Sequence, residues 1–194
     1  MLKYNRLFLL ISIAVLAACE SQRVAKKTYL DIDSLINVQI KSLVTANAHV
    51  IKNASLNNEK AKSEFAMDSL GWATELDIFR QLDVINKPTN KDLYLVIDDE
   101  KDVNSNLTIR QYKAKRELPV KMLSLYYYKN LQNLKKIQAV FKEKNALYAT
   151  ERSLMMEFDE VNGNSRLVHY SIDGIQKMIL GDTIRFTIHC DVIF

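Results

Sequence analysis

The first third of the chain has hydrophobic residues at helical spacing. From residue 28 to about residue 56, the main apolar positions are Ile32, Ile36, Leu43 and Val50. Residues that recur every three or four positions line one face of a helix. This segment is therefore predicted as an amphipathic helix that ends at a polar break.

A second helical pattern follows at residues 59–82. Phe65, Trp72, Leu76 and Phe79 stand at positions i, i+7, i+11 and i+14, so a helix would place all four on one face. We expect these large side chains to supply much of the aromatic area that packs against the rest of the fold.

After residue 92, polar and apolar residues alternate with a period of two. The alternating segments are separated by short polar or glycine-containing turns, as in antiparallel strands. No long helical crossover stands between them, so a parallel sheet is not expected. The predicted strands are 93–97, 107–111, 120–128, 134–143, 146–158, 166–172, 175–180 and 183–194.

These patterns predict an α+β fold. Two N-terminal helices are expected to pack on one face of a curved antiparallel sheet of about eight meandering strands. We expect a single domain at 28–194, with a helical part at 28–83 and antiparallel strands at 92–194. A chain of this length is long enough to bury one hydrophobic core.

The N-terminus has the parts of a secretory signal. Lys3 and Arg6 give a positive start, and residues 7–16 are apolar apart from Ser12. This run is too short for a stable membrane span, which needs about 20 apolar residues. The segment is therefore predicted as an export signal.

The residues that close this run are Leu16-Ala17-Ala18-Cys19, which resemble the lipobox of bacterial lipoproteins at all four positions. The resemblance covers residues 1–19 of the 194. It implies cleavage between Ala18 and Cys19, a diacylglyceryl group on the Cys19 sulfur, and acylation of the new amino group.

The resemblance also implies a location and a processed form. Residues 1–18 would be removed, and 19–27 would form a lipidated tether to a membrane of the cell envelope. Two or more acyl chains anchor a protein stably. Glu20 differs from the aspartate that retains some lipoproteins at the inner membrane, so we expect the outer membrane rather than the inner one.

The charge balance of the chain limits the kinds of partner that it can be expected to bind. The net charge is +4, and it falls to +2 when Lys3 and Arg6 leave with the signal (25 basic against 23 acidic residues). A balance of this kind, without a basic stripe, does not predict nucleic-acid binding. Lipidation of Cys19 would leave Cys190 without a disulfide partner, and we expect it to be buried and inert.

The histidines do not form a catalytic pattern. His49 is predicted on the first helix, and His169 and His189 on the polar faces of their strands. His189 stands beside Cys190, but neighbours on a strand point to opposite faces and form no dyad. No sequence-close set offers the roughly four ligands of a zinc site.

Other sequence motifs also give no catalytic site. The acidic segment 98–104 resembles the start of a calcium loop, yet Val103 stands where such a loop needs glycine, and Ile109 stands where it needs glutamate. No phosphate-binding loop or nucleophile motif is present. The chain is therefore predicted to be no enzyme and to need no metal or cofactor.

Two functions remain open from the sequence. The first is a non-catalytic structural or interaction module that binds another envelope protein or a second copy of itself. The alternative is a periplasmic carrier that binds lipids or other hydrophobic ligands. A continuous cavity larger than about 300 Å³ would favour the carrier, and a filled core with an exposed apolar stripe on the first helix would favour the module. The predicted lining of the carrier's cavity is Phe65, Trp72, Leu76, Phe79, Tyr126, Tyr128, Phe186 and Ile188.

Overall fold

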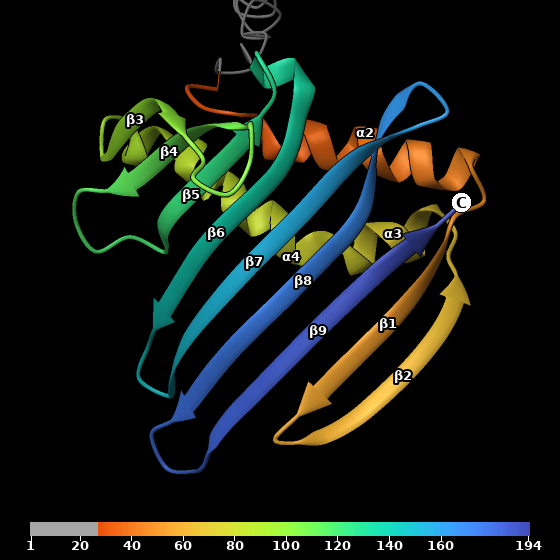
Figure 1. The fold of residues 1–194 in the computed structure, drawn as a ribbon. Helices are drawn as coiled ribbons and strands as arrows, with labels where there is room; N and C mark the ends of the chain where they lie inside the picture. Colours follow the sequence, from red (N-terminus) through yellow and green to blue (C-terminus); the bar gives the residue numbers. More distant parts are fainter. Residues whose placement is uncertain (1–26) are drawn as a thin grey trace, which may run out of the picture.

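An antiparallel sheet forms the body of the molecule, with helices on one of its faces (Figure 1). The structure is a computed structural model and describes residues 27–194. The α+β class with an antiparallel sheet is confirmed. The predicted signal, the cleavage position Ala18 and the lipidation residue Cys19 lie outside the described residues.

The first predicted helix is shorter than expected, because its second half is a β-strand. α2 spans Ile32–Thr45, and a hairpin follows that consists of β1 (His49–Leu56) and β2 (Glu59–Ala66). Asn57 and Asn58 form its turn with φ angles of 47° and 80°, the left-handed conformation that tight hairpin loops favour. The polar break is thus a turn between two strands, and the prediction of helix on both sides of it is wrong.

The second predicted helix is confined to the region after the hairpin. The carboxylate of Asp68 accepts a backbone hydrogen bond at 2.7 Å and caps α3 (Ser69–Glu75). α4 (Asp77–Arg80) and the 3-10 segment η1 (Gln81–Asn86) continue the chain as short turns. Phe65, predicted on this helix, lies instead on the hairpin.

The remaining strands form a meander of seven. Residues 166–172 and 175–180, predicted as two strands, are one continuous strand in which Gly174 stays in the ladder. With the hairpin, the sheet has nine strands instead of the predicted eight. The meander consists of β3 (Tyr94–Lys101), β4 (Thr108–Ala114), β5 (Val120–Tyr127), β6 (Leu134–Lys144), β7 (Tyr148–Val161), β8 (Asn164–Met178) and β9 (Thr183–Ile193), with 3-10 turns at Pro88–Asn90 (η2) and Leu131–Asn133 (η3).

The hairpin extends the meander at its C-terminal edge. The strands lie in the order β2-β1-β9-β8-β7-β6-β5-β4-β3, and all neighbours are antiparallel. β1 pairs with β9 over its full length, from His49 opposite Ile193 to Leu56 opposite Phe186. The N-terminal hairpin therefore reaches the sheet only through the last strand of the chain.

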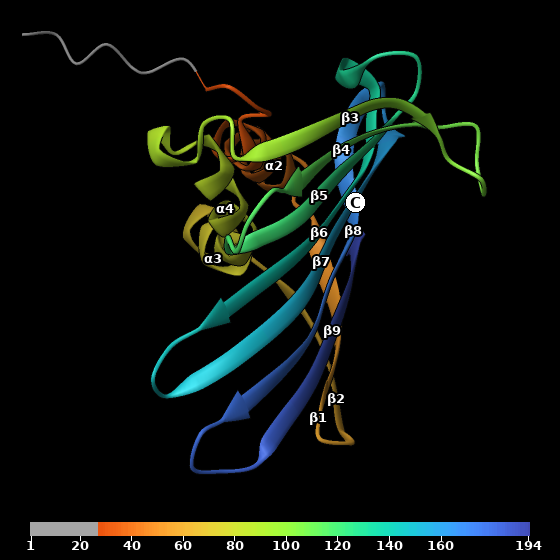
Figure 2. The same ribbon diagram turned by 90° about the vertical axis from the view of Figure 1, so that its left-hand side faces the viewer.

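The helices cover only one end of the sheet. α2, α3 and α4 lie on the same face, and the β6–β7, β8–β9 and β1–β2 turns lie at the other end, beyond them (Figure 1). At that end the long strands bend toward the side of the helices (Figure 2). We call the face that carries the helices the inner face and the opposite one the outer face.

The space between the helices and the sheet is filled by large side chains. The ring of Phe79 meets that of Tyr170 edge-on, with centroids 6.0 Å apart. Aromatic pairs in this geometry stabilise a core beyond the area that they bury. Side chains with no exposed surface include Ile32, Ile36, Leu43, Trp72, Leu76, Phe79, Leu82 and Ile85 from the helical layer and Val50, Leu123, Leu125, Met156, Leu167, Tyr170 and Cys190 from the sheet.

Gly174 provides a test of the β8–β9 pairing. A Cβ atom at this position would lie 2.3 Å from Cζ of Phe186, its partner on β9. We expect Gly174→Ala to lower the free energy of unfolding by about 1–3 kcal/mol, because the ring must move. Denaturant unfolding measures the change.

The matched control is Gly181→Ala, where the nearest atom to a new Cβ is Cβ of Met178 at 3.3 Å, so at most a shift of a few tenths of an ångström is needed. This variant should change stability by less than about 0.5 kcal/mol. Combining Gly174→Ala with Phe186→Leu should reduce the cost of the alanine. Equal costs for both glycine variants would contradict the assigned contact.

Candidate functional site

Beyond the helices, the inner face of the sheet carries apolar side chains that are only partly buried. Side chains alternate along each strand, so the inward positions follow from the buried Val50, Tyr170 and Cys190. Leu56 is 53% exposed. We name this surface the open floor, and it consists of Ala54 and Leu56 of β1, Gly174 of β8, and Ile184, Phe186 and Ile188 of β9.

A polar network marks the border between the helical layer and the open floor. Nζ of Lys52 lies 2.6 Å from Oε1 and 2.7 Å from Oε2 of Glu75. The hydroxyl of Tyr170 donates to the same carboxylate at 3.0 Å. Glu75 is the last residue of α3, so these contacts tie this helix to β1 and β8.

Cys190 lies beside this network and is fully buried, as predicted. Burial raises the pKa of its thiol and outweighs the effect of the neighbouring Tyr170 hydroxyl, which lowers it. Burial and the contact with Cys190 also raise the pKa of the Tyr170 hydroxyl. Both groups are therefore protonated at neutral pH, and a buried neutral thiol is a poor nucleophile.

The structure brings six of the eight predicted lining residues into one hydrophobic cluster and leaves Tyr126 and Tyr128 outside it. Trp72, Leu76 and Phe79 lie in the filled core with no exposed surface. Phe186 and Ile188 belong to the open floor, where they are half-buried.

Of the other three, Phe65 packs against the same cluster and the two tyrosines lie outside it. Phe65 is next to the border network, with Nζ of Lys52 5.7 Å from its ring centroid. Tyr126 lies on the outer face, where its hydroxyl donates to Oε1 of Gln138 at 3.2 Å. Tyr128 is 42% exposed, just after β5 ends. The predicted grouping is therefore wrong for the two tyrosines only.

Two features were expected to distinguish the two functions: a cavity with the predicted lining, and an exposed apolar stripe on the first helix. Neither occurs in the form predicted. An open hollow of about 720 Å³ lies between η1 and the β6–β7 hairpin, but it contains none of the eight lining residues, and charged side chains such as Arg80, Asp83 and Arg152 line it. Another open hollow, of about 390 Å³, lies along β7, β8 and β9 and contains only Phe186 of the eight. The core is filled, yet Val38 is the only large apolar residue of α2 that is exposed. Apolar exposure is instead found on the open floor.

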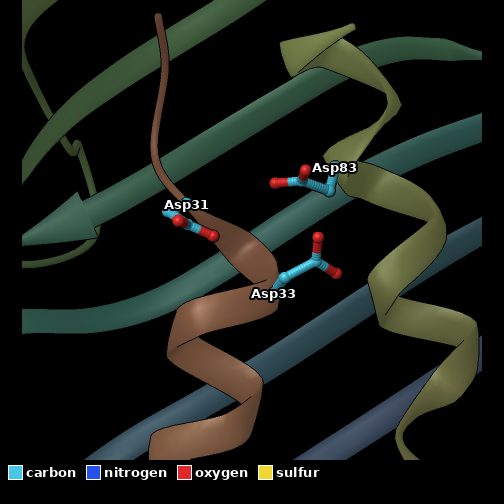
Figure 3. Close-up of side chains that lie close together, drawn as sticks. All are labelled: Asp31, Asp33 and Asp83. Carbon is cyan, nitrogen blue, oxygen red and sulfur yellow. The ribbon is translucent and has the colours of Figure 1, made fainter. Parts of the chain in front are cut away.

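Three carboxylates at the start of the helical layer point toward one another (Figure 3). They belong to Asp31, Asp33 and Asp83, and Nζ of Lys27 binds them at 2.6, 3.1 and 2.7 Å. Burial lowers the pKa of Lys27, but the hydrogen bonds to these carboxylates outweigh it and raise the pKa overall. The ammonium group therefore offsets part of the negative charge of this cluster, as Arg80 does at Asp33, and it fixes the beginning of the described chain to the cluster.

This cluster could not be predicted from the sequence, because Asp83 is distant from the other two aspartates along the chain. Asp31 also caps α2 by accepting a hydrogen bond from the backbone of Ser34 at 2.9 Å. Burial raises the pKa of the Asp31 carboxyl, but its hydrogen bonds with Lys27 and Ser34 lower it by more. The pKa of this carboxyl therefore lies below its usual range.

His169 and His189 lie on the outer face of the sheet, and their prediction on the polar faces of their strands is confirmed. His49 is wrongly predicted on a helix and is instead the first residue of β1. Nδ1 of His169 lies 2.8 Å from Oδ1 of Asp191, and Nε2 of His189 lies 3.3 Å from Oδ1 of Asp173. The sequence analysis missed these carboxylate partners, since only the register of β8 and β9 brings them beside the imidazoles.

No protein-family model, no curated protein and no solved structure matches this chain. Among the helices of residues 27–194, none has the length and hydrophobicity that a membrane span needs.

The border network predicts a stability change on loss of its cation. Lys52→Met should lower the free energy of unfolding by about 1–3 kcal/mol, because it leaves a largely buried carboxylate with one donor fewer. Denaturant unfolding provides the measurement. Adding Glu75→Gln to Lys52→Met should recover part of the loss, since the unpaired charge is then gone.

Lys62→Met is the matched control on β2, where the lysine is exposed. It should change stability by less than about 0.5 kcal/mol. A double variant as unstable as the sum of the two single variants would show that Lys52 and Glu75 do not interact.

Proposed function

We propose that this chain is a membrane-anchored lipoprotein of the cell envelope that works as a non-catalytic interaction module. In this proposal, the open floor binds an apolar segment of another envelope protein. The observation that carries it is the contrast between the filled interior under the helices and the partly exposed apolar surface beyond them. Apolar side chains gathered on one exposed surface mark interaction sites.

A carrier of lipids or other hydrophobic ligands receives less support from the packing. Such proteins bury most of the ligand in a pocket, whereas Trp72, Leu76 and Phe79 occupy the space in which these helices face the sheet. The open floor is a surface rather than an enclosed pocket. A small ligand on it would keep much of its own apolar area in water.

The open floor has a geometry that suits a protein segment. Leu56 stands opposite Phe186 and Ala54 opposite Ile188 on the paired strands, so apolar side chains form adjacent rows. Because the strands bend toward the inner side (Figure 2), a segment laid across them would continue the layer that α3 begins. Each large apolar side chain that becomes fully buried contributes about 1.5–3 kcal/mol.

A lipid anchor would hold this surface near other envelope proteins. Residues 19 to 27 provide eight chain steps, which reach at most about 28 Å when extended. Lys27 is held to the domain by three carboxylates. Tethering raises the local concentration of partners in the same membrane, so a modest apolar contact is sufficient for binding.

The anchor is tested by replacing the predicted lipidation residue. Cys19→Ser should shift the chain from the membrane fraction of the cells that produce it to the soluble fraction or to an uncleaved precursor, because no thiol remains to be acylated. Cys190→Ser is the matched control and should leave the chain in the membrane fraction. Loss of membrane association in both variants, or in neither, would contradict lipidation at Cys19.

The binding surface is tested by photocrosslinking in cells. A photoreactive amino acid at Leu56 or at Ile184 should crosslink the full chain to one and the same envelope protein, identified by mass spectrometry. The same group at Thr187, on β9 but directed to the outer face, should not form this product. Leu56→Asp should abolish the crosslink from Ile184, whereas Leu180→Asp, at a 99% exposed position in the β8–β9 turn, should not.

Three results would overturn this part of the proposal. Crosslinks to lipid from the floor positions would support the carrier instead. A product of two copies of this chain would make the floor a dimer interface. Equal products from Leu56, Ile184 and Thr187 would show that the floor has no preference for a partner.

A further inference from the structure

Two imidazole rings lie close together on the outer face of the sheet. His169 on β8 and His189 on β9 have ring centroids 6.3 Å apart. They occupy diagonal positions of the same ladder, in which His169 pairs with Asp191 and His189 pairs with Ser171. The ladder is regular from His169 to the β8–β9 turn, so the backbone fixes this spacing.

Each of these rings is oriented by its own carboxylate. Asp191 is 2.8 Å from Nδ1 of His169, and Asp173 is 3.3 Å from Nε2 of His189. A carboxylate beside one ring nitrogen places the proton there and makes the other nitrogen the electron-pair donor. This carboxylate–imidazole arrangement is the usual support of histidines that ligate metals. Of the two contacts, the one between His169 and Asp191 has hydrogen-bond geometry, and it leaves Nε2 of His169 as a donor atom.

We propose that His169 and His189 bind one divalent transition-metal ion of the Zn²⁺ and Cu²⁺ class on the outer face. Imidazole nitrogen suits these ions, and metal–nitrogen bonds of about 2.0–2.1 Å allow rings at this separation to share an ion after a small side-chain rotation. Glu157 of β7 pairs with His169 and is a further carboxylate in this part of the sheet, with Lys136 of β6 opposite it. Water completes the coordination.

The surroundings favour a cation at this position. The two rings are accessible, with side chains 23% and 49% exposed, and both supporting aspartates reach solvent. The acidic groups around the rings are Asp173, Asp191 and Glu157. This contrasts with the aspartate cluster at the start of the helical layer, where Lys27 already supplies the positive charge.

The proposal is tested by calorimetric titration of the full-length chain in detergent, carrying no histidine tag, with ZnCl₂ and separately with CuCl₂. We expect one ion per chain, with tighter binding of Cu²⁺ than of Zn²⁺. His169→Ala and His189→Ala should each weaken binding at least tenfold. Asp191→Asn and Asp173→Asn should each weaken it by about tenfold through the orientation of the rings.

Two control variants make the result specific. His49→Ala removes the third histidine, which lies two strands away from His169, and should leave the affinity unchanged. Asp83→Asn should also leave it unchanged. The ion should raise the melting temperature of the unaltered chain and of both controls, but not that of His169→Ala or His189→Ala.

Several outcomes would overturn the site. No saturable binding of either ion would show that the two histidine–aspartate contacts are structural only. A weaker ion affinity in His49→Ala or Asp83→Asn, with His169→Ala unaffected, would place the metal elsewhere. These measurements need neither the anchor nor the protein partner, so they stand apart from the tests of the proposed function.

Discussion

The pairing of β1 with β9 is the constraint on which the rest of the structure depends. It joins His49 to Ile193, near opposite ends of the described chain, and continues without a break to Leu56. α2 enters this hairpin and α3 leaves it, so the pairing places both helices on the same face of the sheet. Contacts so distant in sequence close a long loop, and we infer that this pairing forms late in folding.

The same constraint decides where the sheet is covered and where it is bare. The helical segments next to the hairpin are short, and α3 and α4 together span only Ser69–Arg80. They cover one end of strands that are up to 15 residues long. The border contact of Lys52 with Glu75 stands where this cover stops. The open floor stays uncovered beyond this contact because the helices are shorter than the strands.

The sequence predicted the strands with strict alternation well, such as those at 134–143 and 183–194, because tertiary packing there agrees with the local pattern. It failed at 49–66, where few apolar residues give no clear period and pairing with β9 decides the structure. The predicted break between residues 172 and 175 is absent, because Gly174 stays in the ladder and makes room for Phe186. The positions of the site residues were harder to predict than the strands. A register shift next to Tyr126 changes the face of the sheet on which the following side chains lie.

β8 and β9 carry both candidate surfaces, and the alternation of side chains keeps these surfaces apart. Asp173, which supports His189 on the outer face, directly precedes Gly174, over which the ring of Phe186 packs on the inner face. A metal ion on the outer face therefore acts on the floor only through the backbone ladder. A regular ladder changes little when one side chain rotates, so ion binding should stiffen this pair of strands without reshaping the floor.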